Sequence, residues 1–274
     1  MRQGLFAKGF WNMPFGWMHI YGELPAYLLV VARVAGIAVA APFFSGTVIP
    51  VRIKALLVAA LAAAVFPLVT AQATVALPAD LAAAAGGLAG ELALGWLIGF
   101  SVAAIFMAVQ LGIQMASQQA GMALGEIFNP MLDSSMPIAS ELYFYVSMLI
   151  FLGVHGHHAL VRALLDSFET IPLMGFGLSE QAIGLTVNIL AVSFGLAVRV
   201  GGPIALALLL AFMTLGFVSR TMPQLNILAV GFPIKILIAL VMMAVTVMSL
   251  ESVVLDSIAR VLDGVRTLLG LPLL

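Results

Sequence analysis

Three histidines, His155, His157 and His158, form the one cluster of potential metal ligands that the sequence suggests. A protein zinc site needs three or four ligands that converge on one point. On a helix, the adjacent His157 and His158 point in different directions, and no acidic residue lies within one turn of them. The pattern therefore favours hydrogen bonding at a helix end over metal binding. We expect no metal site and no other cofactor.

The sequence lacks the short motifs of several enzyme classes. It has no H-E-x-x-H zinc motif, no Gly-x-Ser-Gly motif with a partner histidine, and no G-x-x-x-x-G-K-[ST] phosphate loop. No pair of aspartates lies inside the apolar segments, as an aspartyl catalytic pair would require. We therefore expect a protein that is not an enzyme and does not hydrolyse nucleotides itself.

The composition is that of a membrane protein. The chain has 274 residues, of which 63% are hydrophobic and 8% are charged, and its mean hydropathy is +1.19. A soluble domain typically carries about 25% charged residues, so a soluble fold is excluded. The net charge of −1 gives no basic surface for nucleic acid. Cysteine is absent, which excludes disulfides and thiolate metal sites.

Three cations, Arg33, Arg199 and Lys235, lie in or beside apolar segments. A cation near the bilayer centre costs about 2.5–3.5 kcal/mol on insertion scales, so these side chains should face protein or water. Snorkelling toward an interface is the alternative for Arg33. Glu91 could pair with a cation, but we expect it to lie at an interface. Because few acids are near the three cations, we expect partner subunits to complete their neutralisation.

The hydropathy pattern predicts an all-α polytopic integral membrane protein with about six long apolar helices arranged as kinked hairpins. Residues 1–274 should form a single membrane domain. Residues 1–23 read as an aromatic leader at the membrane surface, and residues 251–274 have the periodicity of an amphipathic surface helix. Interior prolines remove helix hydrogen bonds, so kinks are expected at Gly201-Gly202-Pro203 and at Pro233. The predicted apolar segments are residues 24–42, 55–69, 88–109, 141–154, 182–217 and 227–250.

Residues 110–137 interrupt this pattern with glycines, amides and methionines and carry almost no charge. The stretch is too polar to face lipid as an ordinary span and too apolar for a solvated loop. Non-helical backbone is tolerated in a bilayer only where protein buries it or where it lines a cavity. We therefore expect a segment folded into the interior of a helical assembly. A close helix–helix seam would use the same small residues and is the alternative for this stretch. In the preceding apolar segment, Gly95 and Gly99 are four residues apart, a spacing that permits close helix contact.

Four sequence blocks stand in order between residues 24 and 250. The last of them is Pro223-Gln224-Leu225-Asn226, followed by Gly231-Phe232-Pro233. Together the blocks resemble the flagellar biosynthetic protein FliR family, called SctT in virulence injectisomes, and this last block is similar to the family's Pro-Gln-x-Asn and Gly-Phe-Pro blocks. One departure is Asn129-Pro130, where the family commonly has Asp-Pro. The other blocks are Arg33 with Ala41-Pro42-Phe43 and Val48-Ile49-Pro50-Val51-Arg52, then Gly156-His157-His158, then Leu165-Asp166-Ser167-Phe168 with Ile171-Pro172.

The resemblance implies a non-enzymatic pore subunit of the type III protein export gate, in the bacterial inner membrane at the flagellar basal body. Residues 24–181 would be a FliP-like part, and residues 182–250 a FliQ-like hairpin. The expected partners are FliP-like, FliQ-like and FlhB-like subunits, together with the unfolded proteins that pass through the gate. No nucleic acid is expected to bind.

In such proteins, the loop after the third apolar segment is associated with plugging the channel. In this chain, that loop falls within residues 110–137. Uncharged, deformable side chains and glycine backbone suit a seal that excludes water. The matching plug positions are Gly112, Met115, Gly121, Met122, Leu124, Gly125, Ile127, Phe128, Asn129 and Pro130. The positions expected at helix breaks or subunit contacts are Gly201, Gly202, Pro203, Pro223, Gln224, Asn226, Gly231 and Pro233.

Two alternatives stay open at the level of the sequence. The sequence does not clearly distinguish an injectisome homologue from a flagellar protein, and the identity of the neighbouring genes would distinguish them. A self-contained secondary transporter could use the Gly-Gly-Pro and Gly-Phe-Pro breaks as a small-molecule site. A transporter of this kind usually has repeated halves, and no convincing internal repeat is visible.

Overall fold

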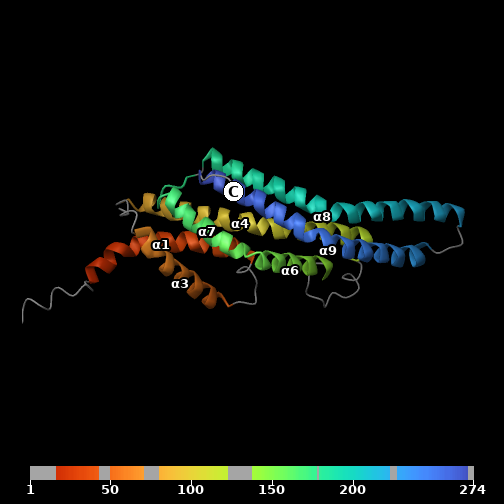
Figure 1. Ribbon diagram of the computed structural model, residues 1–274, viewed down its shortest axis with the longest axis horizontal. Helices are drawn as coiled ribbons and strands as arrows, with labels where there is room; N and C mark the ends of the chain where they lie inside the picture. The colour runs from red at the N-terminus through yellow and green to blue at the C-terminus, as the bar shows by residue number, and fades with distance from the viewer. Residues whose placement is uncertain are drawn as a thin grey trace, which may run out of the picture.

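The computed structural model describes residues 17–42, 50–70, 80–122, 138–177, 179–222 and 227–270, and every regular element in these ranges is an α-helix (Figure 1). The predicted all-α class is therefore confirmed. The leader residues 1–16 lie outside the described part of the chain. The helices are α1 (Trp17–Ala40), α3 (Val51–Thr70), α4 (Leu81–Ala120), α6 (Ile138–Gly153), α7 (Gly156–Thr170), α8 (Glu180–Thr221) and α9 (Ile227–Leu268).

The number of candidate spans is smaller than the predicted six. Within the described residues, α3, α4, α8 and α9 are long and apolar enough to cross a membrane. Helices α6 and α7 add a fifth candidate if they are counted as one broken span, since they meet at a bend of 68°. The described apolar part of α1, Leu24–Ala40, is shorter than the other candidates. Composition revealed the apolar stretches, but it did not reveal that one of them is broken and another is short.

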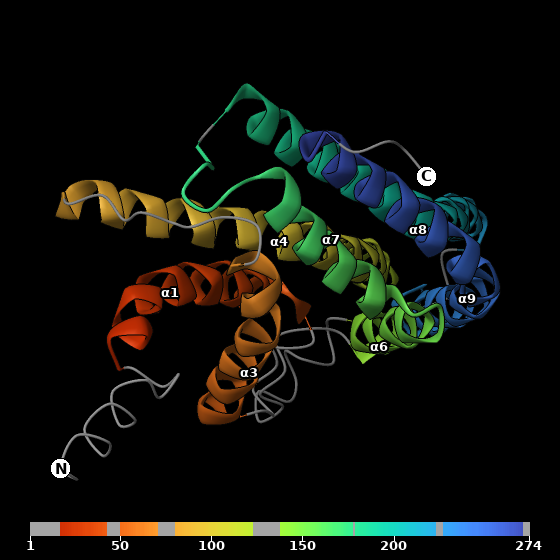
Figure 2. The same ribbon diagram turned by 60° about the vertical axis from the view of Figure 1, so that its left-hand side comes forward.

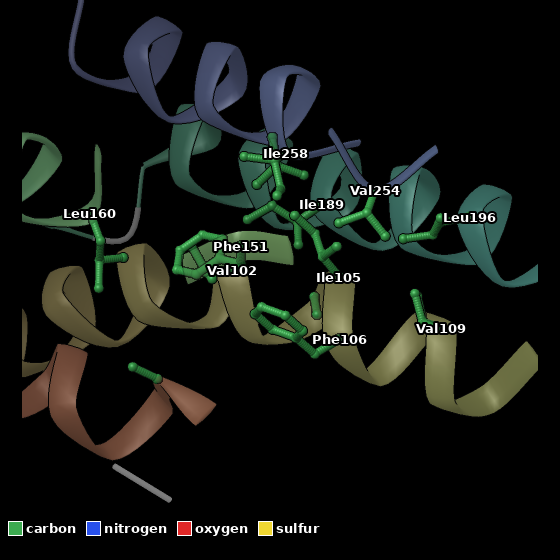
Figure 3. Close-up of a cluster of buried hydrophobic side chains, with 14 of the residues drawn as sticks. Val102, Ile105, Phe106, Val109, Phe151, Leu160, Ile189, Leu196, Val254 and Ile258 are labelled. Atoms are coloured by element: carbon green, nitrogen blue, oxygen red, sulfur yellow. The ribbon is translucent and has the colours of Figure 1, made fainter. Parts of the chain in front are cut away.

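Helix α4 lies at the centre of the bundle and contacts α1, α6, α7, α8 and α9 (Figures 1 and 2). Helix α3 packs on α1 at one side, and the α8–α9 hairpin covers another side. In Figure 3, buried side chains of α4, α6, α7, α8 and α9 meet in one cluster. In lipid, such contacts stabilise the fold through close packing, because lipid tails are as apolar as the side chains themselves. The labelled members are Val102, Ile105, Phe106 and Val109 of α4, Phe151 of α6, Leu160 of α7, Ile189 and Leu196 of α8, and Val254 and Ile258 of α9.

Glycines allow α1 and α4 to approach at backbone distance. A Cβ atom on Gly36 would collide with the Leu92 carbonyl, and one on Gly95 would collide with the Arg33 carbonyl. A Cβ on Gly99 would lie 2.7 Å from the carbonyl oxygen of Ile37. The close contact that the spacing of Gly95 and Gly99 suggested is therefore present. It brings α1 near enough to α4 for the Arg33 side chain to reach Glu91 on that helix.

Helices α8 and α9 contain 42 residues each and continue through Pro203 and Pro233. The predicted breaks are therefore prolines inside uninterrupted helices, although Figure 1 shows α8 changing direction near its middle. At 1.5 Å per residue each helix is about 63 Å long, roughly twice the 30 Å hydrocarbon core of a bilayer. Ordinary tilts of up to about 40° cannot absorb this difference. Part of each helix must therefore extend beyond the hydrocarbon.

The predicted amphipathic tail is not a separate surface helix. Residues 251–268 continue α9 without a break, and their apolar face is buried inside the bundle. Val254, Val261 and Val265 are almost fully covered, while Glu251 and Arg260 face outward. The 3.6-residue periodicity was interpreted correctly as a helix, but its apolar face packs on protein.

Candidate functional site

Arg33 of α1 is fully buried and forms hydrogen bonds with three other residues. Its Nε donates to Oε2 of Glu91 at 2.5 Å, which makes an ion pair between α1 and α4. One terminal nitrogen donates to the carbonyl oxygen and the hydroxyl of Ser167 at 2.8 and 3.2 Å, and the other donates to the carbonyl oxygen of Ile171 at 3.2 Å. The guanidinium also lies 4.2 Å from the ring centre of Phe168. The expectation that Arg33 faces protein is confirmed.

Glu91 is also fully buried, so its predicted place at an interface is wrong. Its second oxygen, Oε1, accepts a hydrogen bond from the backbone N–H of Met174 at 2.8 Å. Met174 has φ of 65°, a left-handed conformation that is unfavourable for a residue other than glycine. Both carboxylate oxygens thus have donors. Burial of the charge is tolerated because it is paired and hydrogen-bonded.

The same face of α4 holds the connection between α7 and α8. A Cβ on Gly87 would collide with the side chain of Met174, and one on Gly90 would lie 2.8 Å from the carbonyl oxygen of Phe176. Gly87, Gly90 and Glu91 are three and four residues apart and share one face of the helix. We define the polar node as Arg33, Glu91, Ser167, Ile171 and Met174. It ties α1, α4 and α7 to the chain that leads into α8.

Arg199 is also neutralised within the chain. Its guanidinium donates to Oδ2 of Asp256 at 2.8 Å, and Arg260 contacts the same oxygen at 3.0 Å. About half of the Arg199 side chain and 42% of the Asp256 side chain are exposed, so this pair faces outward between α8 and α9. The expectation that partner subunits neutralise Arg33 and Arg199 is therefore wrong, because Glu91 and Asp256 supply the charge.

Lys235 of α9 differs from the two arginines. Its Nζ lies 4.8 Å from the ring centre of Phe212 on α8. It lines a groove of about 540 Å³ together with Phe212 and Gln119. Among the residues that the structure describes, no acid forms an ion pair with Lys235. Neutralisation of Lys235 by a partner subunit therefore stays a prediction.

The first part of the predicted interior stretch is helical. Residues 110–120 form the last three turns of α4, so the loop starts later than residue 110. A Cβ on Gly112 would lie 2.5 Å from the carbonyl oxygen of Ala197, and one on Gly201 would lie 2.5 Å from the carbonyl oxygen of Gly112. These two glycines face each other across α4 and α8. Gly112 therefore lies in a helix seam, the alternative that the sequence left open, while Met115 on the same helix is largely exposed.

Helix α4 ends at Gly121, which has φ of 85° and serves as its C-cap. The N–H of Gly121 donates to the Gln118 carbonyl at 3.0 Å, and the N–H of Met122 donates to the Ser117 carbonyl at 3.1 Å. This left-handed C-cap is the usual way for a helix to end at glycine. A Cβ at Gly121 would also lie 2.5 Å from the Phe232 ring. The other plug candidates, Leu124, Gly125, Ile127, Phe128, Asn129 and Pro130, lie outside the described residues.

The three histidines lie where α6 gives way to α7. His155 has φ of 58° and is the N-cap of α7, without a side-chain capping bond. The ring centres of the three residues are 4.3 to 6.1 Å apart. Within the described part of the chain, no group of three or more histidine and acidic side chains is placed to hold a metal ion. The three histidines therefore lie at a helix junction and are not arranged as a metal site.

The positions expected at helix breaks are spread over α8 and α9. Gly201 lies in the seam with α4, and Gly231 is buried. Pro223, Gln224 and Asn226 lie outside the described residues. No sequence pattern indicated Asp256 or Met174 as polar partners. Ser167 and Phe168 carried a signal, since they stand in one of the blocks that resemble the family.

These features define an all-α membrane protein whose central helix is held by glycine seams and by a buried ion pair. A model of the family described as Bacterial export proteins, family 1, matches residues 24–261. Because this match covers most of the chain, the chain belongs to that family, whose flagellar and injectisome members the sequence blocks resemble.

The chain is also similar in sequence to individual proteins of flagellar and virulence export systems. The flagellar biosynthetic protein FliR of Bacillus subtilis (strain 168) is 28% identical over 155 residues, which are 55% of this chain and 60% of the relative. FliR of Escherichia coli (strain K12) is 27% identical over 45% of this chain and 48% of its own length. The Yop proteins translocation protein T of Yersinia pestis is 27% identical over 54% of this chain and 58% of its own length. The chain thus spans about half to three fifths of the length of these relatives.

Proposed function

We propose that the chain is a pore subunit of a flagellar type III protein export gate in the bacterial inner membrane. It assembles with FliP-like and FliQ-like subunits, and with an FlhB-like subunit, and unfolded export substrates pass through the assembly. Residues 24–181 act as the FliP-like part and residues 182–250 as the FliQ-like hairpin. The observation that carries the proposal is the family match over residues 24–261.

The uneven burial of the long helices supports an assembly. In its most apolar window, α4 has 72% of its residues buried, whereas α8 and α9 each have 22% buried. Large side chains such as Phe194, Phe217 and Met248 are exposed on these two helices. Since part of each 42-residue helix lies beyond the hydrocarbon, lipid cannot cover all of this apolar surface. Apolar helices of neighbouring subunits would cover the remainder.

The proposed seal lies beyond the end of α4. Residues 110–120 pack in a helix seam, so the closing contacts are assigned to the chain that follows Gly121, with Leu124, Ile127 and Phe128 as apolar members and Asn129 and Pro130 after them. Gly112 then anchors the helix from which this segment leaves. Met115 and Met122 flank the exit point and supply deformable apolar contacts.

Deletion and complementation test the proposal. Without the chain, we expect cells to make no flagellar filament and to secrete no flagellar export substrate, and re-expression of the chain should restore both. Measuring secretion of a flagellar and an injectisome substrate side by side distinguishes the two export systems. Normal filaments together with lost injectisome secretion would reassign the chain to an injectisome. Normal secretion in both systems would contradict the proposed function.

A further inference from the structure

An apolar cavity lies between α1, α3 and α7. Its volume is about 160 Å³, and all three helices contribute to its wall. Figures 1 and 2 show α3 running at an angle to α1, so the two helices diverge. On each helix the lining residues are one, three or four positions apart, which places them on one face. Those of α1 and α3 are Val34, Ile37, Ala38, Leu57, Val58 and Leu61.

Helix α7 completes the wall with Leu160, Val161, Leu164 and His157. Among the described residues that line the cavity, His157 alone has a polar side chain. Its Nδ1 is shielded from solvent and has no hydrogen-bond partner in the described part of the chain. A buried water molecule makes about three hydrogen bonds to polar groups, which one shielded nitrogen cannot supply. The cavity therefore suits an apolar occupant.

The cavity has a buried inner side and an open outer side. Val34 and Leu164 are each 2% exposed, whereas Leu57 is 45% and Val161 is 37% exposed. The open side therefore lies where α3 and α7 face outward. An apolar cavity of about 150 Å³ in another protein stays dry and takes up benzene, so a cavity of this size holds about six carbon atoms.

Helix α3 places this open side against lipid. Its 20 residues span about 30 Å, the thickness of one hydrocarbon core, whereas α4, α8 and α9 are about twice as long. In its apolar window, 11% of the residues are buried within the chain, so α3 faces mostly outward. The exposed Arg52 in its first turn suits the headgroup level. Leu57 and Leu61 then lie about 8 Å and about 14 Å further along the helix, at the depth of the acyl chains.

We propose that this cavity binds one acyl chain of a membrane phospholipid. The acyl chain enters between Leu57 and Val161, and its carbons pack on Val34 and Leu164. The phosphate stays at the level of Arg52. A phospholipid is favoured over a side chain of another subunit, because α3 has the length of one bilayer and faces outward beside the opening. The inference does not depend on the proposed export function.

Photo-crosslinking from the acyl chain tests this site. The full chain, purified with its accompanying subunits, is placed in nanodiscs of phosphatidylethanolamine and phosphatidylglycerol. A trace of phosphatidylethanolamine carries a diazirine within one acyl chain, and the labelled residues are identified by mass spectrometry. We expect label on Val34 and Leu164, which are too buried for lipid that covers only the outer surface. Label confined to outward-facing residues such as Leu56 would overturn the proposal.

Matched variants show whether the cavity itself takes up the chain. Ala38→Phe fills the cavity from α1, so label on Val34 and Leu164 should fall at least about tenfold, because burial of several methylenes is lost. The control Ala60→Phe makes the same change at an exposed position of α3 outside the cavity and should keep label within about twofold of the original chain.

A second filling variant covers the case in which Ala38→Phe folds poorly. Val58→Phe fills the cavity from α3 and should lower the label on Val34 and Leu164 to the same extent. Full labelling of either filling variant, or a loss in Ala60→Phe as large as theirs, would overturn the proposal.

Discussion

Arg33 and Glu91 form a fully buried ion pair at 2.5 Å, although 58 residues separate them along the chain. The pair joins α1 to the central helix α4, and its remaining hydrogen bonds reach α7 and the chain that enters α8. Because each partner neutralises the other, removing one of them leaves an uncompensated charge inside the bundle.

The first prediction follows from this pair. Glu91→Gln keeps the shape of the side chain but leaves the Arg33 guanidinium without a counter-charge. We expect a loss of about 3–5 kcal/mol in stability, measured as the thermal midpoint and the yield of folded protein in detergent. The control Arg260→Gln alters an exposed ion pair and should leave the midpoint unchanged.

The double variant Arg33→Met and Glu91→Leu sharpens this test. Because it removes both charges together, it should be more stable than Glu91→Gln alone, even though hydrogen bonds to Ser167 and Ile171 are lost. If Glu91→Gln melts at the same temperature as Arg260→Gln, the buried ion pair does not stabilise the fold.

The second prediction concerns the seam between α4 and α8. Gly112→Ala should force the two helices apart, because its Cβ would meet the Ala197 carbonyl at 2.5 Å. Overpacking of this kind costs about 1–3 kcal/mol. Gly195→Ala is the matched control on α8, since nothing lies within 4 Å of its Cβ position. A lower midpoint and a lower complex yield are expected for Gly112→Ala only, and equal behaviour of the two variants would argue against a tight seam.

A third prediction concerns the seal. Deleting residues 123–127 removes part of the proposed plug while keeping the C-cap at Gly121. Each buried apolar side chain contributes about 1.5–3 kcal/mol when fully removed from water, so the closed state should be weakened. The gate should then assemble in normal yield but leak ions, which is measured as conductance in planar bilayers and as poor growth in high salt. An assembled complex that stays tight would contradict the plug.

The histidines provide a fourth prediction. Replacing His155, His157 and His158 together by Gln should leave assembly and protein export largely intact, because an amide also hydrogen-bonds at a helix end. Elemental analysis of the purified protein should find no zinc bound in proportion to the chain, before or after the change. Bound zinc that disappears in the variant together with export would show that the cluster is a metal site.

The sequence carried enough information for the fold class and for the approximate positions of the helices. Long apolar runs around residues 24–40, 182–217 and 227–250 predict helices because each run must satisfy its own backbone hydrogen bonds in lipid. Their ends were harder to place. The polar and glycine-rich residues 110–120 look unlike a span, yet they complete α4 because protein, not lipid, surrounds most of that helix.

The polar node was only half predictable. Burial of Arg33 followed from the energy of a charge in a bilayer. Its partner could not be chosen, because the one-dimensional pattern does not state which helix faces meet. Glu91, Asp256 and Met174 lie 58, 57 and 83 residues from the groups that they contact. Only the close approach of α1 and α4, made possible by Gly36 and Gly95, brings the first pair together.

Co-purification tests the central claim, that this chain is one subunit of an export gate. The tagged chain is extracted from the membrane in mild detergent, and its complex is analysed by size, mass and subunit identity. The account predicts a single large complex that contains FliP-like and FliQ-like proteins. It also predicts that the chain is unstable or aggregates when it is expressed alone. A monodisperse monomer that transports a small solute in liposomes would contradict the account and would identify a self-contained transporter.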